Sequence, residues 1–361
     1  MENLVVSTNK KITMDKILSQ VKVIASSGIK RVLDTSVNSV IQNADCSNNV
    51  VTVGGKFLVK VVYLNNEDVI EFADAICEFA DKQKAEFSLT DCFAKDSVTI
   101  EGVSFSDNEI ICMVSHTVEI FGVYKYEMPI ISSTENDLVL SRKMFDSLKM
   151  VSSAEDTFVV AEEVDSNVQN VEVLRSSANV VLSEVSCAVD KIVLEGKIVS
   201  DVLYKSDETI GVFSHEFDFK QEISAENVVP NTISDAVVIL KNITVTPEQS
   251  ENKTTLVYAI DLVAKGYVFE ENTYEVASDM FSLKNEIQTT YDYFETRNFA
   301  AQKTGEDTFL SQTDVSLIPN FDDVLTVTNA SAKVLNIQKD NEKWVAKVFV
   351  SAVAICRVAE S

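Results

Sequence analysis

Residues 31–67, RVLDTSVNSVIQNADCSNNVVTVGGKFLVKVVYLNNE, align without a gap to residues 172–208, EVLRSSANVVLSEVSCAVDKIVLEGKIVSDVLYKSDE. Eleven of the 37 aligned positions are identical. The identical pairs are Val32/Val173, Leu33/Leu174, Ser36/Ser177, Asn38/Asn179, Val40/Val181, Cys46/Cys187, Gly55/Gly196, Lys56/Lys197, Val61/Val202, Tyr63/Tyr204 and Glu67/Glu208. The offset is constant at 172 − 31 = 141 residues, so the chain contains a duplicated unit of about 140 residues, which is a common domain size.

A weaker third copy begins near Asp323. The stretch DVLTVTNASAKVLNIQKDNEKWVAKVFVSAVAIC at 323–356 resembles the start of the second copy but lacks its glycine and its tyrosine. We therefore predict four parts. They are an N-terminal segment with a short helix at 1–30, a first β module at 31–165, a second β module at 166–305 and a partial third module at 306–361.

The residue pattern is that of an all-β protein. Stretches rich in Val, Ile, Thr, Tyr and Phe are separated by clusters of Asn, Asp, Ser and Glu that are typical of turns. In GKFLVKVVY the side chains of Phe57, Val59, Val61 and Tyr63 alternate along the stretch and are expected on one face of a strand. This pattern predicts tandem antiparallel β modules, sandwich-like or barrel-like, with few short helices.

Two short helices are expected. Thr13 is a suitable N-cap for a helix through MDKILSQVKV, and DAICEFADKQKA at 74–85 has helix-favouring composition.

The chain is acidic, with a net charge of −25. Such a surface repels phosphate backbones and anionic lipid, so we expect no nucleic-acid partner and no membrane insertion. The sequence has no run of about eighteen apolar residues and no secretory signal at its start, which favours a cytoplasmic protein. The six cysteines have no CxxC spacing and are expected to be free thiols, with Cys46 and Cys187 as small fillers beside a turn.

The residues for catalysis are scarce. His116 and His215 are the only histidines, and they do not occupy equivalent positions in the two copies. Each is expected to be a structural residue of a strand rather than a general base. No metal-binding, phosphate-binding or nucleophile motif occurs in the sequence, so we expect no catalytic residues, no metal and no cofactor.

The repeated motifs resemble the SPOCS domain. A leading Val-Leu is followed by G-K-x-x-x-x-V-x-Y, and a later acidic-x-aromatic-Ser element precedes a polar strand. The first element is matched by Gly55, Lys56, Val61 and Tyr63 in the first copy and by Gly196, Lys197, Val202 and Tyr204 in the second. The later element is matched by residues 278–282 (SDMFS), and less well by residues 142–147 (RKMFDS) as its equivalent in the first copy.

The resemblance has functional implications. SPOCS domains occur in tandem in spore coat and SipL-type spore morphogenesis proteins of clostridia and their relatives. Such proteins often end in a LysM peptidoglycan-binding domain, and we find nothing like one here. The resemblance therefore implies a structural protein of the spore surface that binds morphogenetic or coat proteins from the mother-cell cytoplasm.

Two function classes remain open. The first is this non-enzymatic interaction protein of spore coat assembly. The alternative is an adhesion or surface β-sandwich protein of an anaerobic bacterium, unrelated to sporulation. In either case, we expect the partial third module to dock on the second module or to pair with a neighbouring subunit, burying Trp344, Val348 and Val350.

Overall fold

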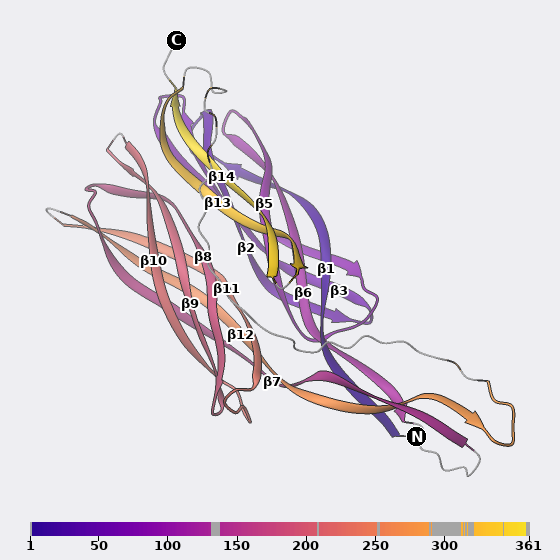
Figure 1. Cartoon of the computed structure of the whole chain (residues 1–361). Coiled ribbons are helices and arrows are strands. Elements are labelled where there is room, and N and C mark those ends of the chain that lie inside the picture. Colours follow the sequence, from indigo (N-terminus) through magenta and orange to yellow (C-terminus); the bar gives the residue numbers. More distant parts are fainter. Residues whose placement is uncertain are drawn as a thin grey trace.

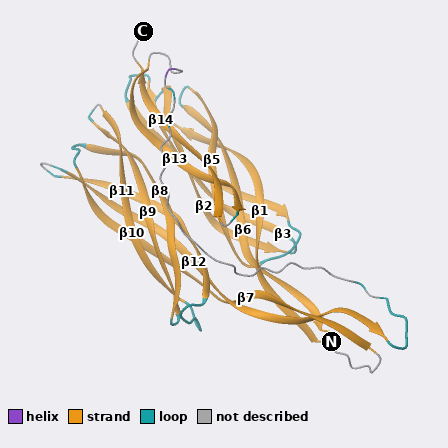
Figure 2. Cartoon of the chain, in the orientation of Figure 1, coloured by secondary structure: helices purple, strands orange, loops and turns teal. Residues whose placement is uncertain are grey.

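The computed structural model describes residues 2–130, 138–207, 209–250, 253–288, 290, 312, 314, 316, 321–341 and 343–358. The described chain is all β, as predicted, with fourteen strands and several small antiparallel sheets (Figures 1 and 2). The strands are β1 Glu2–Ile24, β2 Ile29–Ser47, β3 Val50–Asn65, β4 Ile70–Lys84, β5 Thr90–Ser106, β6 Glu109–Ile130, β7 Leu138–Ser166, β8 Val171–Ala188, β9 Lys191–Ser206, β10 Thr209–Ser224, β11 Ile233–Gln249, β12 Thr254–Ser282, β13 Phe321–Asp340 and β14 Lys343–Val358.

Both predicted helices are wrong. The segment after Thr13 lies in β1, which pairs with β6, and residues 74–84 lie in β4, which pairs with β3. In β4 the small or apolar residues Ala73, Ala75, Cys77 and Phe79 turn toward the core while the residues between them are exposed. The period is therefore two, and the Glu and Lys residues that suggested a helix occupy the outer face of a strand.

The strands form two six-stranded sandwiches and one hairpin. In the first sandwich the sheet β1-β6-β5 faces the sheet β2-β3-β4, and in the second the sheet β11-β12-β7 faces the sheet β10-β9-β8. One side of each sandwich is closed where β2 runs beside β5 and where β8 runs beside β11. The strands β13 and β14 form a separate two-stranded sheet. We call these units the first sandwich, the second sandwich and the third hairpin.

The hydrogen bonding starts each repeat one strand earlier than our module boundaries. The strand β1, within the predicted N-terminal segment, pairs with β6 of the first sandwich. The strand β7, which we assigned to the first module, pairs along its length with β12 of the second sandwich. Consequently residues 142–147 and 278–282 are not equivalent parts of successive copies, because they lie on neighbouring antiparallel strands of one sheet. The ends of β1, β6, β7 and β12 extend beyond the sandwiches near the N-terminus (Figure 1).

The repeat positions fall on equivalent strands. Tyr63 on β3 pairs with Val32 on β2, and Tyr204 on β9 pairs with Val173 on β8. As predicted from their alternation, the β3 side chains on one face are fully buried; they are Phe57, Val59, Val61 and Tyr63.

The repeated glycine allows close packing between neighbouring strands. A Cβ atom at Gly55 would lie 2.4 Å from the carbonyl oxygen of Val40 and 2.8 Å from the ring of Phe79. At Gly196 the same contacts are made by the Val181 oxygen at 2.4 Å and the Phe219 ring at 2.7 Å. Only glycine leaves room for the aromatic ring and the facing backbone at this position.

A pair of β-bulges recurs in all three hairpins. The register shifts between Val32 and Asp34 in the first copy, between Val173 and Arg175 in the second and between Val324 and Thr326 in the third. Another shift recurs nine or ten residues later, at 41/43, 182/184 and 334/336, and the third hairpin has an additional shift between them at 328/331. Because bulges bend and twist a strand in a defined way, their recurrence supports the third hairpin as a copy of β2–β3 and β8–β9.

The predicted burial of the third hairpin is wrong within this chain. Trp344, Val348 and Val350 are 71%, 42% and 43% exposed. The registers place Trp344 at the position of Val51 and Ile192, and Val350 at the position of Phe57 and Ile198. Those four counterparts are fully buried because a third strand and a facing sheet cover them, whereas β13 and β14 pair only with each other among the described residues.

Candidate interaction surface

The two sandwiches meet through residues of β2, β3, β4 and β5 in the first and of β7, β8, β9, β10 and β12 in the second. At one end of the junction, Arg175 Nε donates to Asp34 Oδ2 at 3.0 Å, and both side chains are almost completely buried. Apolar side chains surround this ion pair, with Val62, Leu174 and Leu203 forming the buried centre.

A second ion pair marks the other end. Lys265 Nζ on β12 lies 2.9 Å from Asp91 Oδ1, and Ser153 Oγ on β7 donates to Asp91 Oδ2 at 2.7 Å. Burial favours the neutral form of Asp91 and acts to raise its pKa. The hydrogen bonds from Lys265 and Ser153 outweigh this effect, so the pKa of Asp91 lies below the usual value. Phe93 packs against Tyr267 beside this pair, with ring centroids 5.4 Å apart.

A groove of about 1060 Å³ lies between these two ends. It is bordered by β2, β5, β8 and β11, and Val350 of the third hairpin reaches it. Its walls are largely aliphatic, with Val40, Val180 and Leu240 among the side chains that line it. The groove also contains Lys60, Lys95 and Lys241, and among the described residues none of these three is in an ion pair. The lining also contains Lys265 and the carboxylates of Asp96 and Glu155, so it is apolar with charged side chains of both signs.

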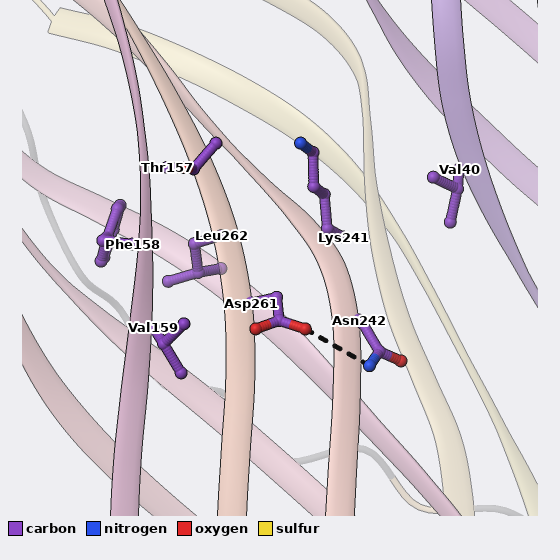
Figure 3. A pocket seen from close by; sticks show the side chains of 8 residues that line it. All are labelled: Val40, Thr157, Phe158, Val159, Lys241, Asn242, Asp261 and Leu262. Carbon is purple, nitrogen blue, oxygen red and sulfur yellow. Dashed lines mark hydrogen bonds between the residues drawn. The ribbon is translucent and has the colours of Figure 1, made fainter.

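A shallower pocket of about 450 Å³ continues the groove and shares Val40, Lys241 and Asn242 with it. Figure 3 shows Asn242 turned toward Asp261, to which its side-chain nitrogen donates at 3.4 Å, while the amine of Lys241 points away from that carboxylate. The remaining lining is Thr157, Phe158, Val159 and Leu262. These groups offer contacts to an extended segment but do not form an acid–base pair or a nucleophile with its base.

His116 is enclosed in the first sandwich and lines neither hollow. Its Nδ1 lies 3.3 Å from Asp96 Oδ2, and its Nε2 lies 3.2 Å from Asp81 Oδ2, an ion-pair contact without hydrogen-bond alignment. The rings of Phe57 and Phe79 pack edge-on against the imidazole at 5.0 and 4.9 Å. This environment agrees with the structural role predicted for His116.

His215 is also placed as a strand residue. It is half-buried on β10 and packs between Phe213 and Phe217, with ring centroids 6.3 and 4.7 Å away.

The repeated tyrosines and the repeated cysteines are packed within the sandwiches or beside their turns. Tyr63 is fully buried, and its hydroxyl donates to Glu71 Oε2 at 2.6 Å, whereas the Tyr204 ring lies over Gly211. All six cysteines are free; Cys46 is buried beside its turn and Cys187 is half-buried. Among the described residues, no cluster of three or more His, Cys, Asp or Glu side chains is suited to a metal ion.

The third hairpin adds an exposed apolar surface. The side chains that occupy core positions in the two sandwiches are solvent-facing here, and the outer face is apolar as well, with Phe349 57% and Val353 45% exposed. The hairpin contacts β10 of the second sandwich, yet it still presents both faces and an unpaired edge among the described strands. Surfaces of this kind pair with other β strands.

Asp34 and Arg175 are the residues that sequence reasoning missed. They align with each other in the repeat, carry opposite charges and each directly follow a Val-Leu pair. That combination was a usable signal, since a charged residue in a buried strand requires a partner.

Comparison with known families gives one match. Residues 168–248 match the family described as SipL, SPOCS domain. The matched region covers nearly all of β8 to β11, so it contains the repeated hairpin, the third strand of its sheet and the edge strand of the facing sheet. Comparisons with curated proteins and with solved structures give no match.

The match relates the chain to sporulation proteins, as the sequence motifs implied. Among the described residues, no helix is long and apolar enough to cross a bilayer.

Proposed function

We propose that this chain is a non-enzymatic structural protein of the spore envelope that acts by binding other proteins during coat assembly. The SPOCS match at residues 168–248 supports the connection to sporulation. The proposal places the protein at the mother-cell side of the developing spore surface, where spore coat or morphogenetic proteins are its partners.

The exposed apolar face of the third hairpin is the observation that carries the binding role. Trp344 and Val350 occupy core positions of the repeated fold, Val348 stands where the sandwiches have glycine, and all three are exposed in this chain. Burying a large apolar side chain contributes about 1.5–3 kcal/mol, so covering this face gives a strong drive for association. We infer that the occupant is a strand of a second copy of this chain, which adds to the unpaired edge and covers the core face.

The absence of catalysis is part of the proposal. Both histidines are held by aromatic rings within strands, and neither lines the hollows between the sandwiches, whose lining contains the carboxylates Asp96, Glu155 and Asp261 but no histidine. These surroundings favour contact over chemistry. Repetition of a module also strengthens weak binding, because a second contact on the same chain forms at high effective concentration.

Localisation in a sporulating host tests this function. A fluorescently tagged full chain is expected to collect at the forespore surface during sporulation, and a Trp344→Ser/Val350→Ser variant is expected to remain diffuse in the mother cell. If the tagged protein is instead displayed on vegetative cells and is indifferent to sporulation, the adhesion alternative replaces this proposal.

A further inference from the structure

The ion pair between the sandwiches joins aligned positions of the repeat. Asp34 and Arg175 are 175 − 34 = 141 residues apart, which is the offset of the repeat. Each residue directly follows a β-bulge, with Asp34 opposite Val62 on β3 and Arg175 opposite Leu203 on β9. Their side chains are 1% and 2% exposed, and Arg175 Nε lies 3.0 Å from Asp34 Oδ2.

The apolar residues around the pair are aligned counterparts as well. Val62 of the first sandwich corresponds to Leu203 of the second, and Leu33 corresponds to Leu174. Ile70 and Ile210, at equivalent register positions on β4 and β10, also belong to the cluster, and Val212 is its one member without a counterpart in it. The two sandwiches therefore meet through the same patch of their surfaces, in the manner of a two-fold symmetric dimer.

Such an interface brings a residue face to face with its own counterpart. Two identical first sandwiches meeting through this patch would bury two aspartates together, and two second sandwiches would bury two arginines. Either arrangement would bury two like charges next to each other without an opposite charge. The free energy of such a contact is strongly unfavourable, because water cannot reach the charges.

We propose that Asp34 and Arg175 make this interface selective for unlike copies, so that a first sandwich accepts only a second sandwich as its neighbour. The aliphatic residues supply attraction that all copies share, and the charge at this one position decides which copies pair. The third hairpin carries Thr326 at the aligned position, which neutralises neither charge. The hairpin is thus excluded from this patch and left for other contacts.

Charge reversal in the full chain tests the proposal. Asp34→Arg places two arginines in the patch, and Arg175→Asp places two aspartates there. Each single variant is expected to lower the melting temperature by roughly 10 °C and to increase the radius of gyration in X-ray scattering. The double variant D34R/R175D restores an opposite pair with its order reversed and is expected to recover more than half of both changes.

A matched control uses an exposed pair in the second sandwich. Lys220 Nζ lies 2.5 Å from Glu195 Oε1, and both side chains are largely exposed. The variant Lys220→Glu is expected to shift the melting temperature by no more than about 2 °C, because exposed ion pairs contribute little.

Mixing the two single variants separates selectivity from stability. In the D34R chain two arginines face each other between the sandwiches, and in the R175D chain two aspartates do. The first sandwich of either chain, however, carries the charge complementary to that of the second sandwich of the other chain. The comparison is made in the Trp344→Ser/Val350→Ser background, which removes the association expected through the third hairpin. In that background, differently tagged D34R and R175D chains are expected to copurify several-fold more than two chains without a charge reversal. If the mixed variants copurify no more than those chains, or if the double reversal is no more stable than the single variants, the proposal is overturned.

Discussion

At the scale of single residues, the repeated glycine is the clearest link between sequence and packing. In the second sandwich, a Cβ atom at Gly196 would lie 2.4 Å from the Val181 carbonyl oxygen and 2.7 Å from the Phe219 ring. Backbone cannot yield as a flexible side chain can, so we expect Gly196→Ala to lower the free energy of unfolding by about 1–3 kcal/mol. Denaturant unfolding of the full chain measures this change.

Gly102 provides the control for that prediction. A Cβ atom at Gly102 meets no heavy atom within 4 Å. Gly102→Ala is therefore expected to leave stability within about 0.5 kcal/mol of wild type. Equal effects of the two substitutions would show that the packing at Gly196 is not what requires glycine there.

The buried imidazole gives a second prediction at this scale. The registers place Ile260 at the position of His116, Leu240 at the position of Asp96 and Gln221 at the position of Asp81. His116→Ile would leave the Asp81 and Asp96 carboxylates without the imidazole that contacts both, and it is expected to cost about 3–5 kcal/mol.

The triple variant D81Q/D96L/H116I transplants the second sandwich's residues and is expected to recover most of that loss in thermal unfolding. A His116→Ile variant as stable as wild type would show that the imidazole does not compensate these charges.

At the scale of elements, one hydrogen-bond network ties the β1–β2 turn to β3 and β4. Glu71 accepts bonds from the hydroxyl of Tyr63 at 2.6 Å, from Ser27 at 2.7 Å and from Ser26 at 3.0 Å. These bonds, led by that of Tyr63, lower the pKa of Glu71 from 4.5 to about 2. The second sandwich has Gly211 at the equivalent position and no such carboxylate.

The lowered pKa predicts a pH dependence. A carboxyl group whose pKa is lower in the folded state stabilises the fold above its unfolded pKa, and this contribution is lost as pH falls through the folded value. Wild type is therefore expected to be more stable than Glu71→Gln at pH 6, with the difference shrinking between about pH 4.5 and pH 2. Thermal unfolding of both proteins across this range measures it, and a constant difference would contradict the assignment.

The sequence predicts some of the strands but not others. The alternation in β3 predicted its buried face because four apolar residues at a spacing of two leave little ambiguity. The strands β1 and β4 were misassigned because their outer faces carry helix-favouring Lys, Gln and Glu, and only pairing with distant β6 and nearby β3 decides their conformation. In β13, a register shift between Thr328 and Ser331 keeps one strand continuous through a polar stretch of the sequence.

At the scale of the whole molecule, repetition accounts for both the architecture and its asymmetry. The same bulged hairpin occurs three times, but each copy differs at the positions where copies meet. Asp34 and Arg175 complement each other, and the core face of the third hairpin is exposed. The aligned sequences contain these differences, whereas which positions face each other follows only from the folded arrangement.

At this scale, the third hairpin is expected to bind a β strand of another copy of this chain. The most direct measurement is the molar mass of the full chain by light scattering over a range of concentrations. Wild type is expected to associate, and Trp344→Ser/Val350→Ser is expected to be monomeric with an unchanged melting temperature, because both side chains are exposed in the single chain.

The matched control Phe72→Ser/Ile76→Ser removes apolar side chains of similar exposure from β4, which belongs to a complete sandwich, and it is expected to associate as wild type does. A wild-type chain that stays monomeric throughout, or a hairpin variant that associates as strongly as wild type, would contradict the claim.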